Sequence, residues 1–157
     1  MSKFEKKTLA TMDRHPKEYP INEVFNWIVA NPGKKKAEID GHIINVNSIR
    51  YETFMQKGTT CCVCGLNGDH FYKERNFTTG GYVNDGPYHF NLYATTADGK
   101  EILMTKDHIL AKSLGGKDHV SNMQTMCTCC NNEKSNMTTE QWEDSLKTKK
   151  GTEEDGV

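Results

Sequence analysis

The chain has 157 residues, of which 35% are hydrophobic, and its mean hydropathy is −0.75. This length suits one modest domain with extensions, whose small apolar core would gain stability from a structural metal. The net charge of −1 excludes an overtly basic nucleic-acid-binding protein. Residues 137–157 hold three basic and six acidic residues, so the remainder carries +2, a weak lean towards a polyanionic partner.

The N-terminus predicts a cytoplasmic protein without membrane contact. Met1-Ser2-Lys3-Phe4 leads into no apolar run that could form a signal peptide or a membrane span. Because the cytoplasm keeps thiols reduced, the six cysteines are expected to be metal ligands or free thiols rather than disulfides.

Residues 1–45 are expected to form an N-terminal extension with helical content. Apolar side chains at positions 24, 25, 28 and 29 predict a helix over 20–30, which ends at Asn31-Pro32-Gly33. Residues 41–46 predict a short strand. A helix over 48–57 should follow, with Asn47 as its cap and Gly58 as its stop.

Residues 65–88 are rich in Gly, Asn, Asp and Thr, which predicts an irregular loop with a short strand at 70–72. A hairpin should follow it. Apolar residues alternate at 90, 92 and 94, Asp98-Gly99 favours a tight turn, and 101–105 forms the returning strand. That strand leads directly into Asp107-His108.

The C-terminal part should contain a loop at 114–118, a strand over 121–126 and a helix that begins around 127–131 and carries Lys134. Residues 138–141 resemble a capping box for a last helix through about residue 147. Its Trp142 and Leu146 are four positions apart and should pack together on the domain. Residues 149–157 are expected to form a disordered tail.

Two cysteine pairs share the same two-residue gap: Cys61 with Cys64, and Cys127 with Cys130. This spacing lets both thiolates of a pair face one ion at a tight turn, and two pairs complete a closed tetrahedral site. The pattern therefore predicts a structural zinc ion.

Two other interpretations of these cysteines exist. A Cys-x-x-Cys pair can serve in redox chemistry, but two pairs without a thioredoxin-like pattern disfavour that role. Either Cys62 or Cys129 could replace its neighbour as a ligand. The set with matched spacing is favoured, which leaves Cys62 and Cys129 as free thiols.

The adjacent Asp107 and His108 at a strand end suit a division of labour, because neighbours on an extended backbone point to opposite sides. Asp107 offers a hard oxygen ligand suited to Mg²⁺ or Mn²⁺. His108 can take a proton from water. Asn131, directly after the last zinc cysteine, can supply a second oxygen ligand. A lone Asp-His dipeptide is usually ordinary surface polarity, so the case depends on the ordered set.

That ordered set resembles the HNH endonucleases, which share the order acidic residue–His, Asn, Cys-x-x-Cys-Asn and Lys. In this chain the order runs through Asp107-His108, Asn122, Cys127-Thr128-Cys129-Cys130-Asn131 and Lys134. The similarity covers Cys61–Cys64 and roughly residues 101–136, with a softer likeness to phage-encoded HNH proteins in the hairpin and over 46–50. Ala111 departs from the proline often found at its position.

The resemblance implies an α+β fold with a ββα-metal core, a structural zinc site and an N-terminal helical extension. Residues 46–148 would form the nuclease domain. Asp107 and Asn131 would bind the catalytic Mg²⁺ or Mn²⁺, His108 would be the general base, and Asn122 would orient His108 through the loop backbone.

The leading hypothesis is therefore an endonuclease that hydrolyses phosphodiester bonds in DNA and nicks one strand per active site. Lys112 and Lys134 flank the site, as phosphate contacts or as solvated surface lysines. One alternative is a non-catalytic zinc module that binds nucleic acid or a protein. Another is a phage nuclease that acts in the host cytoplasm through a phage or host protein partner.

Overall fold

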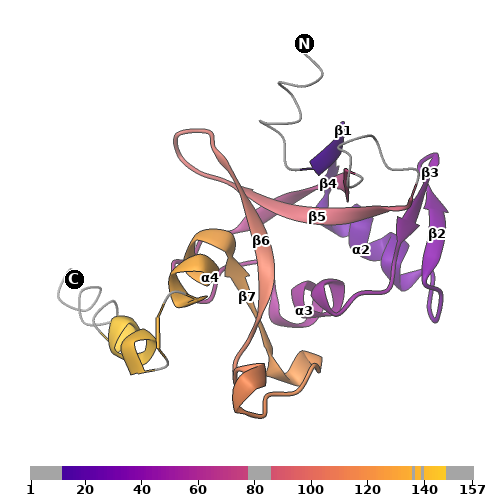
Figure 1. Ribbon diagram of the computed structural model, residues 1–157. Helices are drawn as coiled ribbons and strands as arrows, with labels where there is room; N and C mark the ends of the chain where they lie inside the picture. The colour runs from indigo at the N-terminus through magenta and orange to yellow at the C-terminus, as the bar shows by residue number, and fades with distance from the viewer. Residues whose placement is uncertain (1–11, 78–85, 136, 139, 148–157) are drawn as a thin grey trace.

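The structure, a computed structural model, describes residues 12–77, 86–135, 137–138 and 140–147. These residues form a mixed α+β fold around a seven-stranded sheet (Figure 1). The sheet runs in the order β1-β4-β5-β3-β2, and β6 pairs with both β5 and β7. Its strands are β1 (Met12–Pro20), β2 (Lys36–Ile39), β3 (His42–Asn45), β4 (Gly68–Asn76), β5 (Tyr88–Thr95), β6 (Glu101–His108) and β7 (Met123–Cys127). The helices are α2 (Ile21–Val29), α3 (Ile49–Lys57) and α4 (Thr128–Ser135), with 3-10 turns η1 (Lys112–Leu114) and η2 (Val120–Asn122).

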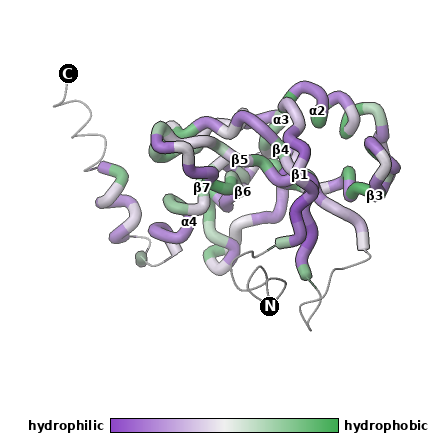
Figure 2. The backbone as a smooth tube through the Cα atoms, turned by 90° about the horizontal axis from the view of Figure 1, so that it is seen from above, coloured by the Kyte–Doolittle hydropathy of each residue, from purple (hydrophilic) through white to green (hydrophobic). Residues whose placement is uncertain are grey.

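The N-terminal extension contributes strands as well as the predicted helix. That helix is confirmed as α2, which buries Val24 and Ile28. The expectation of a merely helical extension was incomplete, since β1 pairs with β4 at the sheet edge. The register of β1 shifts between Arg14 and Glu18, around Pro16, which has no N–H to donate. Figure 2 shows β1 as largely hydrophilic, as suits an edge strand.

A tight two-residue turn at Asp40-Gly41 joins β2 to β3. Both residues have positive φ, 48° and 85°, as this kind of hairpin turn requires. Ile39 pairs with His42 directly across the turn. The predicted strand at 41–46 is thus confirmed, as the second arm of a hairpin.

Within the irregular segment predicted over 65–88, the short strand at 70–72 is confirmed, but it is longer than expected; residues 78–85 lie outside the described residues. Residues 68–76 form β4, a nine-residue strand paired with β1 and β5. Its Lys73 is fully buried and donates to the carbonyl oxygens of Ile39 and Asp40 at 2.7 and 3.0 Å. Glu74 is buried too, and it accepts from Tyr93 at 2.6 Å. A polar sequence can form this strand because its charged groups have partners.

The helix predicted over 48–57 is confirmed as α3, with Gly58 at its end. The cap assigned to Asn47 was wrong. Ser48 is the N-cap, and its hydroxyl accepts from the backbone N–H of Arg50 at 3.1 Å. From this helix Tyr51 reaches the sheet, where it donates to the Asn45 carbonyl at 2.8 Å and accepts from the N–H of Phe90 at 2.9 Å.

The predicted hairpin is confirmed as β5 and β6, with the turn at Asp98-Gly99. The strand predicted over 121–126 begins later, as β7, because 120–122 form a 3-10 turn. Chain reversal after β6 brings β7 antiparallel to it, and α4 follows at once (Figure 1). The result is a β6–β7–α4 unit.

A further helical segment covers residues 140–147. The predicted capping box is confirmed, because Thr138 and Gln141 each donate a backbone N–H to the other's side chain, at 3.0 and 3.1 Å. Trp142 is buried in the core cluster and Leu146 packs against it. The predicted tail over 149–157 lies outside the described residues. No helix in the described part of the chain has the length and apolar character to cross a membrane.

Candidate functional site

The two cysteine pairs meet between α3 and the β6–β7–α4 unit. The sulfur atoms of Cys61, Cys64, Cys127 and Cys130 all lie within 4.8 Å of one another. Cys62 and Cys129 are exposed and lie outside this cluster. Four converging thiols fit the tetrahedral sulfur coordination of a structural zinc site.

Backbone hydrogen bonds hold the first cysteine turn in place. Cys61 donates its N–H to the carbonyl of Leu66 at 2.8 Å, and Cys62 donates to the carbonyl of Thr125 in β7 at 2.9 Å. Burial acts to raise the pKa of Cys61, but backbone hydrogen bonds to its sulfur outweigh burial and bring the pKa to about 7. Burial instead raises the pKa of Cys64 and Cys130, so a metal ion would have to displace the protons of these two thiols.

The second cysteine pair begins where β7 becomes α4. Cys127 ends the strand, and its sulfur accepts the backbone N–H of Cys130 at 3.4 Å in the first helical turn. Asn131 comes next in the helix. The cysteine cluster thus fixes the helix start that presents Asn131 to β6.

A groove of about 710 Å³ lies against the end of β6 and α4. It is lined by the last residues of β6, the following loop, α4 and the 140–147 helix. Asp107, His108, Lys112, Asn131 and Lys134 all line it. The structure therefore brings together five of the residues singled out in the sequence.

Asp107 is the most enclosed carboxylate of the groove, with 12% of its side chain exposed. Its Oδ2 accepts from Lys134 Nζ at 2.6 Å and from Gln124 Nε2 at 3.0 Å. Lys134 also donates to the backbone carbonyl of His108 at 3.0 Å. Lys134 is therefore a partner of the site's carboxylate and backbone, rather than a solvated lysine.

Asn131 reaches towards β6 from α4. Its Nδ2 donates to the hydroxyl of Thr105 at 3.0 Å, and Thr105 in turn donates to the carbonyl of Met126 at 2.8 Å. Because the amide nitrogen is engaged, the amide oxygen is the atom left to act as a ligand.

His108, the last residue of β6, faces the loop as well as the groove. Its Nε2 lies 2.6 Å from Oδ1 of Asp118, and Lys112 Nζ lies 3.0 Å from Oδ2 of the same carboxylate. The hydrogen bond to His108, with that to Lys112, holds the pKa of Asp118 below its ordinary value. Lys112 is 72% exposed, so it remains reachable from solvent.

Asn122 does not contact the imidazole of His108. Its side chain instead accepts from the N–H of Leu110 at 2.9 Å and donates to the carbonyls of Leu110 and Lys117 at 3.1 and 3.0 Å. Its own carbonyl accepts from Ile109 at 2.8 Å. Asn122 thus closes the loop that follows His108 through hydrogen bonds to the loop backbone.

Two residues of the site were missed by sequence reasoning. Gln124 pairs with Asp107 across the β6–β7 ladder, a contact that follows from strand register. Asp118 contacts His108 only because the loop folds back on itself. The one available signal for that fold was the pair Gly115-Gly116, which favours a sharp reversal.

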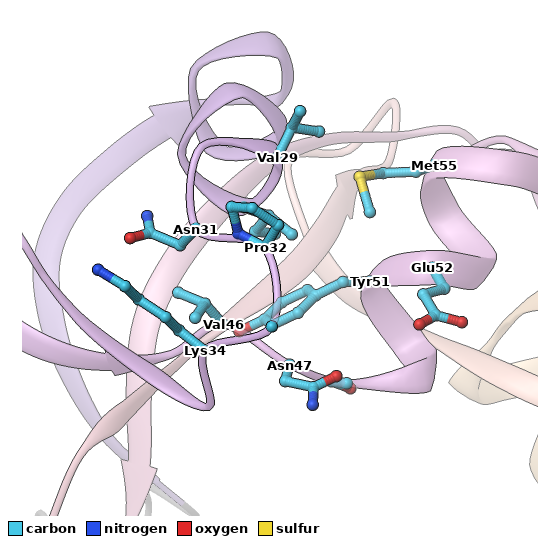
Figure 3. Close-up of a pocket in the computed structure, with 12 residues that line it drawn as sticks. Val29, Asn31, Pro32, Lys34, Val46, Asn47, Tyr51, Glu52 and Met55 are labelled. Carbon is cyan, nitrogen blue, oxygen red and sulfur yellow. The ribbon is translucent and has the colours of Figure 1, made fainter.

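A separate hollow of about 250 Å³ lies between the end of α2 and α3 (Figure 3). Val29, Pro32 and Met55 give it an apolar wall, with Lys34 and Glu52 at its rim. Its lining residues all lie between 28 and 55, outside the HNH-like order, so this hollow is not the candidate site.

Comparison with known families finds a match to a family model described as HNH endonuclease, over residues 96–147. Neither a curated protein nor a solved structure matches the chain. The matched span contains β6, the loop closed by Asn122, β7, α4 and the 140–147 helix. It indicates nuclease activity and a nucleic-acid substrate. Residues 96–147 of this chain, with the groove that they form, are similar to the HNH endonuclease family.

Proposed function

We propose that the chain is a metal-dependent endonuclease that hydrolyses phosphodiester bonds in DNA, one strand per active site. The observation that carries this proposal is the convergence of Asp107, His108, Asn131 and Lys134 on one groove within the family match. A carboxylate, an imidazole, an amide and an ammonium group together provide the functional groups that phosphodiester hydrolysis needs.

The cysteine cluster would hold a structural zinc ion. Its four sulfurs satisfy the closed tetrahedral donor set, and three of the four residues are buried. Placing zinc there would fix α4 against the end of β7, and with it the position of Asn131. The ion would thus support the site without touching substrate.

The groove also fits a hard divalent cation such as Mg²⁺ or Mn²⁺, because Asp107 and Asn131 offer oxygen ligands. When bound there, the cation supplies electrostatic stabilisation for charge that develops on the scissile phosphate and the departing 3′ oxygen. Gln124 would keep the Asp107 carboxylate oriented by its hydrogen bond of 3.0 Å.

His108 would act as the general base. It would take a proton from an in-line water, whose oxygen bonds to phosphorus while the bond from phosphorus to the 3′ oxygen breaks. The 3′ oxygen then takes a proton from solvent, which leaves a 5′-phosphate and a 3′-hydroxyl. General-base assistance of this kind is typically worth ~10²–10⁴-fold. Asn122 would keep the His108 backbone in place through the loop.

The two lysines would meet the phosphate backbone. Lys112 is exposed at the groove and can reach a phosphate oxygen. Lys134 is held against Asp107, so its charge would act close to the scissile group.

A plasmid-nicking assay tests the proposal. Purified protein should convert supercoiled plasmid to the nicked form with Mg²⁺ or Mn²⁺, stop with EDTA, and recover when the divalent ion is restored. Asp107→Ala should abolish nicking, whereas Asp98→Asn, at an exposed turn carboxylate, should retain it. Absence of nicking by a zinc-loaded, folded chain would favour the non-catalytic zinc module.

A further inference from the structure

The contact between His108 and Asp118 determines which ring nitrogen is protonated. Nε2 lies 2.6 Å from Oδ1 of Asp118. An ionised carboxylate can only accept hydrogen bonds, so Nε2 must be the donor. In the neutral ring the lone pair then belongs to Nδ1, which makes no hydrogen bond within the described residues.

The second carboxylate oxygen of Asp118 also has a partner. Lys112 Nζ lies 3.0 Å from Oδ2, so each oxygen of the carboxylate has a partner of its own. A carboxylate with both oxygens engaged has less freedom to rotate away from the imidazole than one with a single partner.

The loop between β6 and β7 folds back on itself, which places Asp118 beside the end of β6. Asn122 binds both polar backbone atoms of Leu110 and the carbonyl of Lys117, the residue before Asp118. A Cβ at Gly116 would lie 1.8 Å from the Leu110 carbonyl oxygen, a contact that no side chain permits. Close approach at Gly116 and the Asn122 bonds therefore bring Asp118 to His108.

We propose that Asp118 is a positioning residue for His108, an inference that rests on the proposed nuclease function. Asp118 holds the ring in the Nε2–H form, fixes its orientation, and leaves Nδ1 to receive the proton from water. Once that proton is transferred, the same carboxylate stabilises the positively charged imidazole. Partners that orient a metal-binding histidine in this way are typically worth ~10–100-fold, and the same scale is taken for His108.

The test compares the wild-type chain with Asp118→Ala, Asp118→Asn and the control Asp98→Asn, all zinc-loaded. Nicking is measured as kcat and KM for plasmid with saturating Mn²⁺. Long-range proton–nitrogen NMR correlations of the imidazole report which His108 nitrogen carries the proton. Zinc content and thermal unfolding establish that each variant is folded.

We expect Asp118→Ala to lower kcat by about 10–100-fold with little change in KM, and to lose the Nε2–H signature. Asp118→Asn should have a kcat between those of the wild type and Asp118→Ala, because its amide oxygen still accepts a hydrogen bond but carries no charge. Asp98→Asn should match the wild type. If the alanine variant does not fold, the asparagine variant carries the same test.

Wild-type kcat in the Asp118 variants, or a loss confined to KM, would overturn the inference while the nuclease assignment stands. An Nδ1–H signature in the wild type would overturn it as well. Failure of the wild-type chain itself to nick DNA would instead remove the proposed function. Failure of the inference would therefore be seen in the Asp118 variants or in the NMR spectrum, and failure of the proposed function in the nicking assay of the wild-type chain.

Discussion

His70 and His108 both lie 2.6 Å from a carboxylate oxygen through Nε2, yet they occupy opposite chemical situations. His70 is buried, and both of its nitrogens meet carboxylates: Nδ1 meets Asp69 and Nε2 meets Glu101. Two carboxylate acceptors favour a proton on each ring nitrogen, which is the charged form of the imidazole. His108 engages a carboxylate through one nitrogen and lines the groove.

This difference teaches that a histidine close to a carboxylate does not by itself mark a catalytic site. What matters is whether a ring nitrogen is left to accept a proton. His70 connects three strands, since its Nε2 lies 4.0 Å from Glu18 on β1 and 2.6 Å from Glu101 on β6. His108 ends its strand and lies beside the residues proposed to bind metal. Four variants or conditions can break or sharpen the contrast.

The largest effect should follow loss of the cysteine cluster, because this cluster holds the segment of the chain that carries His108 in place. Structural zinc contributes about 10–16 kcal/mol in small domains at neutral pH, comparable to or larger than the ~5–15 kcal/mol stability of typical proteins. Cys130→Ser should therefore lose zinc and the cooperative thermal transition. Cys129→Ser, at an exposed neighbour outside the cluster, is the matched control. A Cys130→Ser chain with full zinc content would contradict the assigned ligands.

The next largest effect separates the two histidines by activity. His108→Ala should lower the nicking rate by ~10²–10⁴-fold at saturating Mn²⁺, because the general base is removed. His70→Gln should leave that rate unchanged. Zinc content and the circular dichroism spectrum should match the wild type in His108→Ala. Equal loss of activity in both variants would show that the contrast lies in stability alone.

A smaller effect separates them by stability. His70→Gln removes a buried cation from carboxylates on three strands, and should lower the free energy of unfolding by about 1–3 kcal/mol. Urea unfolding measures this change. Lys100→Gln serves as the control, since its 3.8 Å contact with Asp98 is exposed and should be worth less than about 0.5 kcal/mol. An equal shift in both variants would mean that the His70 contacts add nothing.

The smallest effect is the pH dependence of that stability. Burial lowers the pKa of His70, but hydrogen bonds and charge from Asp69 and Glu101, with Glu18 nearby, outweigh burial and raise it above 6.5. A raised folded pKa stabilises the chain below about pH 6.5, and that stability is lost as pH rises through the folded value. Arg14, which binds Glu101 at 2.9 Å, limits the effect to about 1 kcal/mol. Urea unfolding from about pH 6 to about pH 9 should show a decline that His70→Gln lacks.

Much of the fold could be predicted because local signals were strong. Asp98-Gly99 between two alternating segments gave a hairpin, and the capping box at 138–141 gave a helix start. The same turn signal stands at Asp40-Gly41, where it joins β2 and β3, but it was overlooked there. Strand β4 was predicted only over residues 70–72, for a different reason. Its buried Lys73 and Glu74 look like surface residues in a sequence, because their partners come from distant segments.

The residues of the candidate site also divide into those that the sequence could predict and those that it could not. Asp107, His108 and Asn131 could be singled out because their order and spacing to the cysteines are local properties of the chain. The contacts that orient them were not visible in that order. Gln124 meets Asp107 through strand register, and Asp118 meets His108 through loop closure. Both depend on three-dimensional pairing over 10 to 17 positions of sequence.

Strand β5 has a consequence for how this chain folds. Its first residues pair in parallel with β3, and its last residues pair with β6. The connection from β3 to β5 contains α3, the Cys61 turn and β4. Bringing such distant strands together is slow because a long loop must close first. Zinc capture at Cys61 and Cys64 would draw that connection towards β7, so the rate of refolding should rise with free zinc concentration.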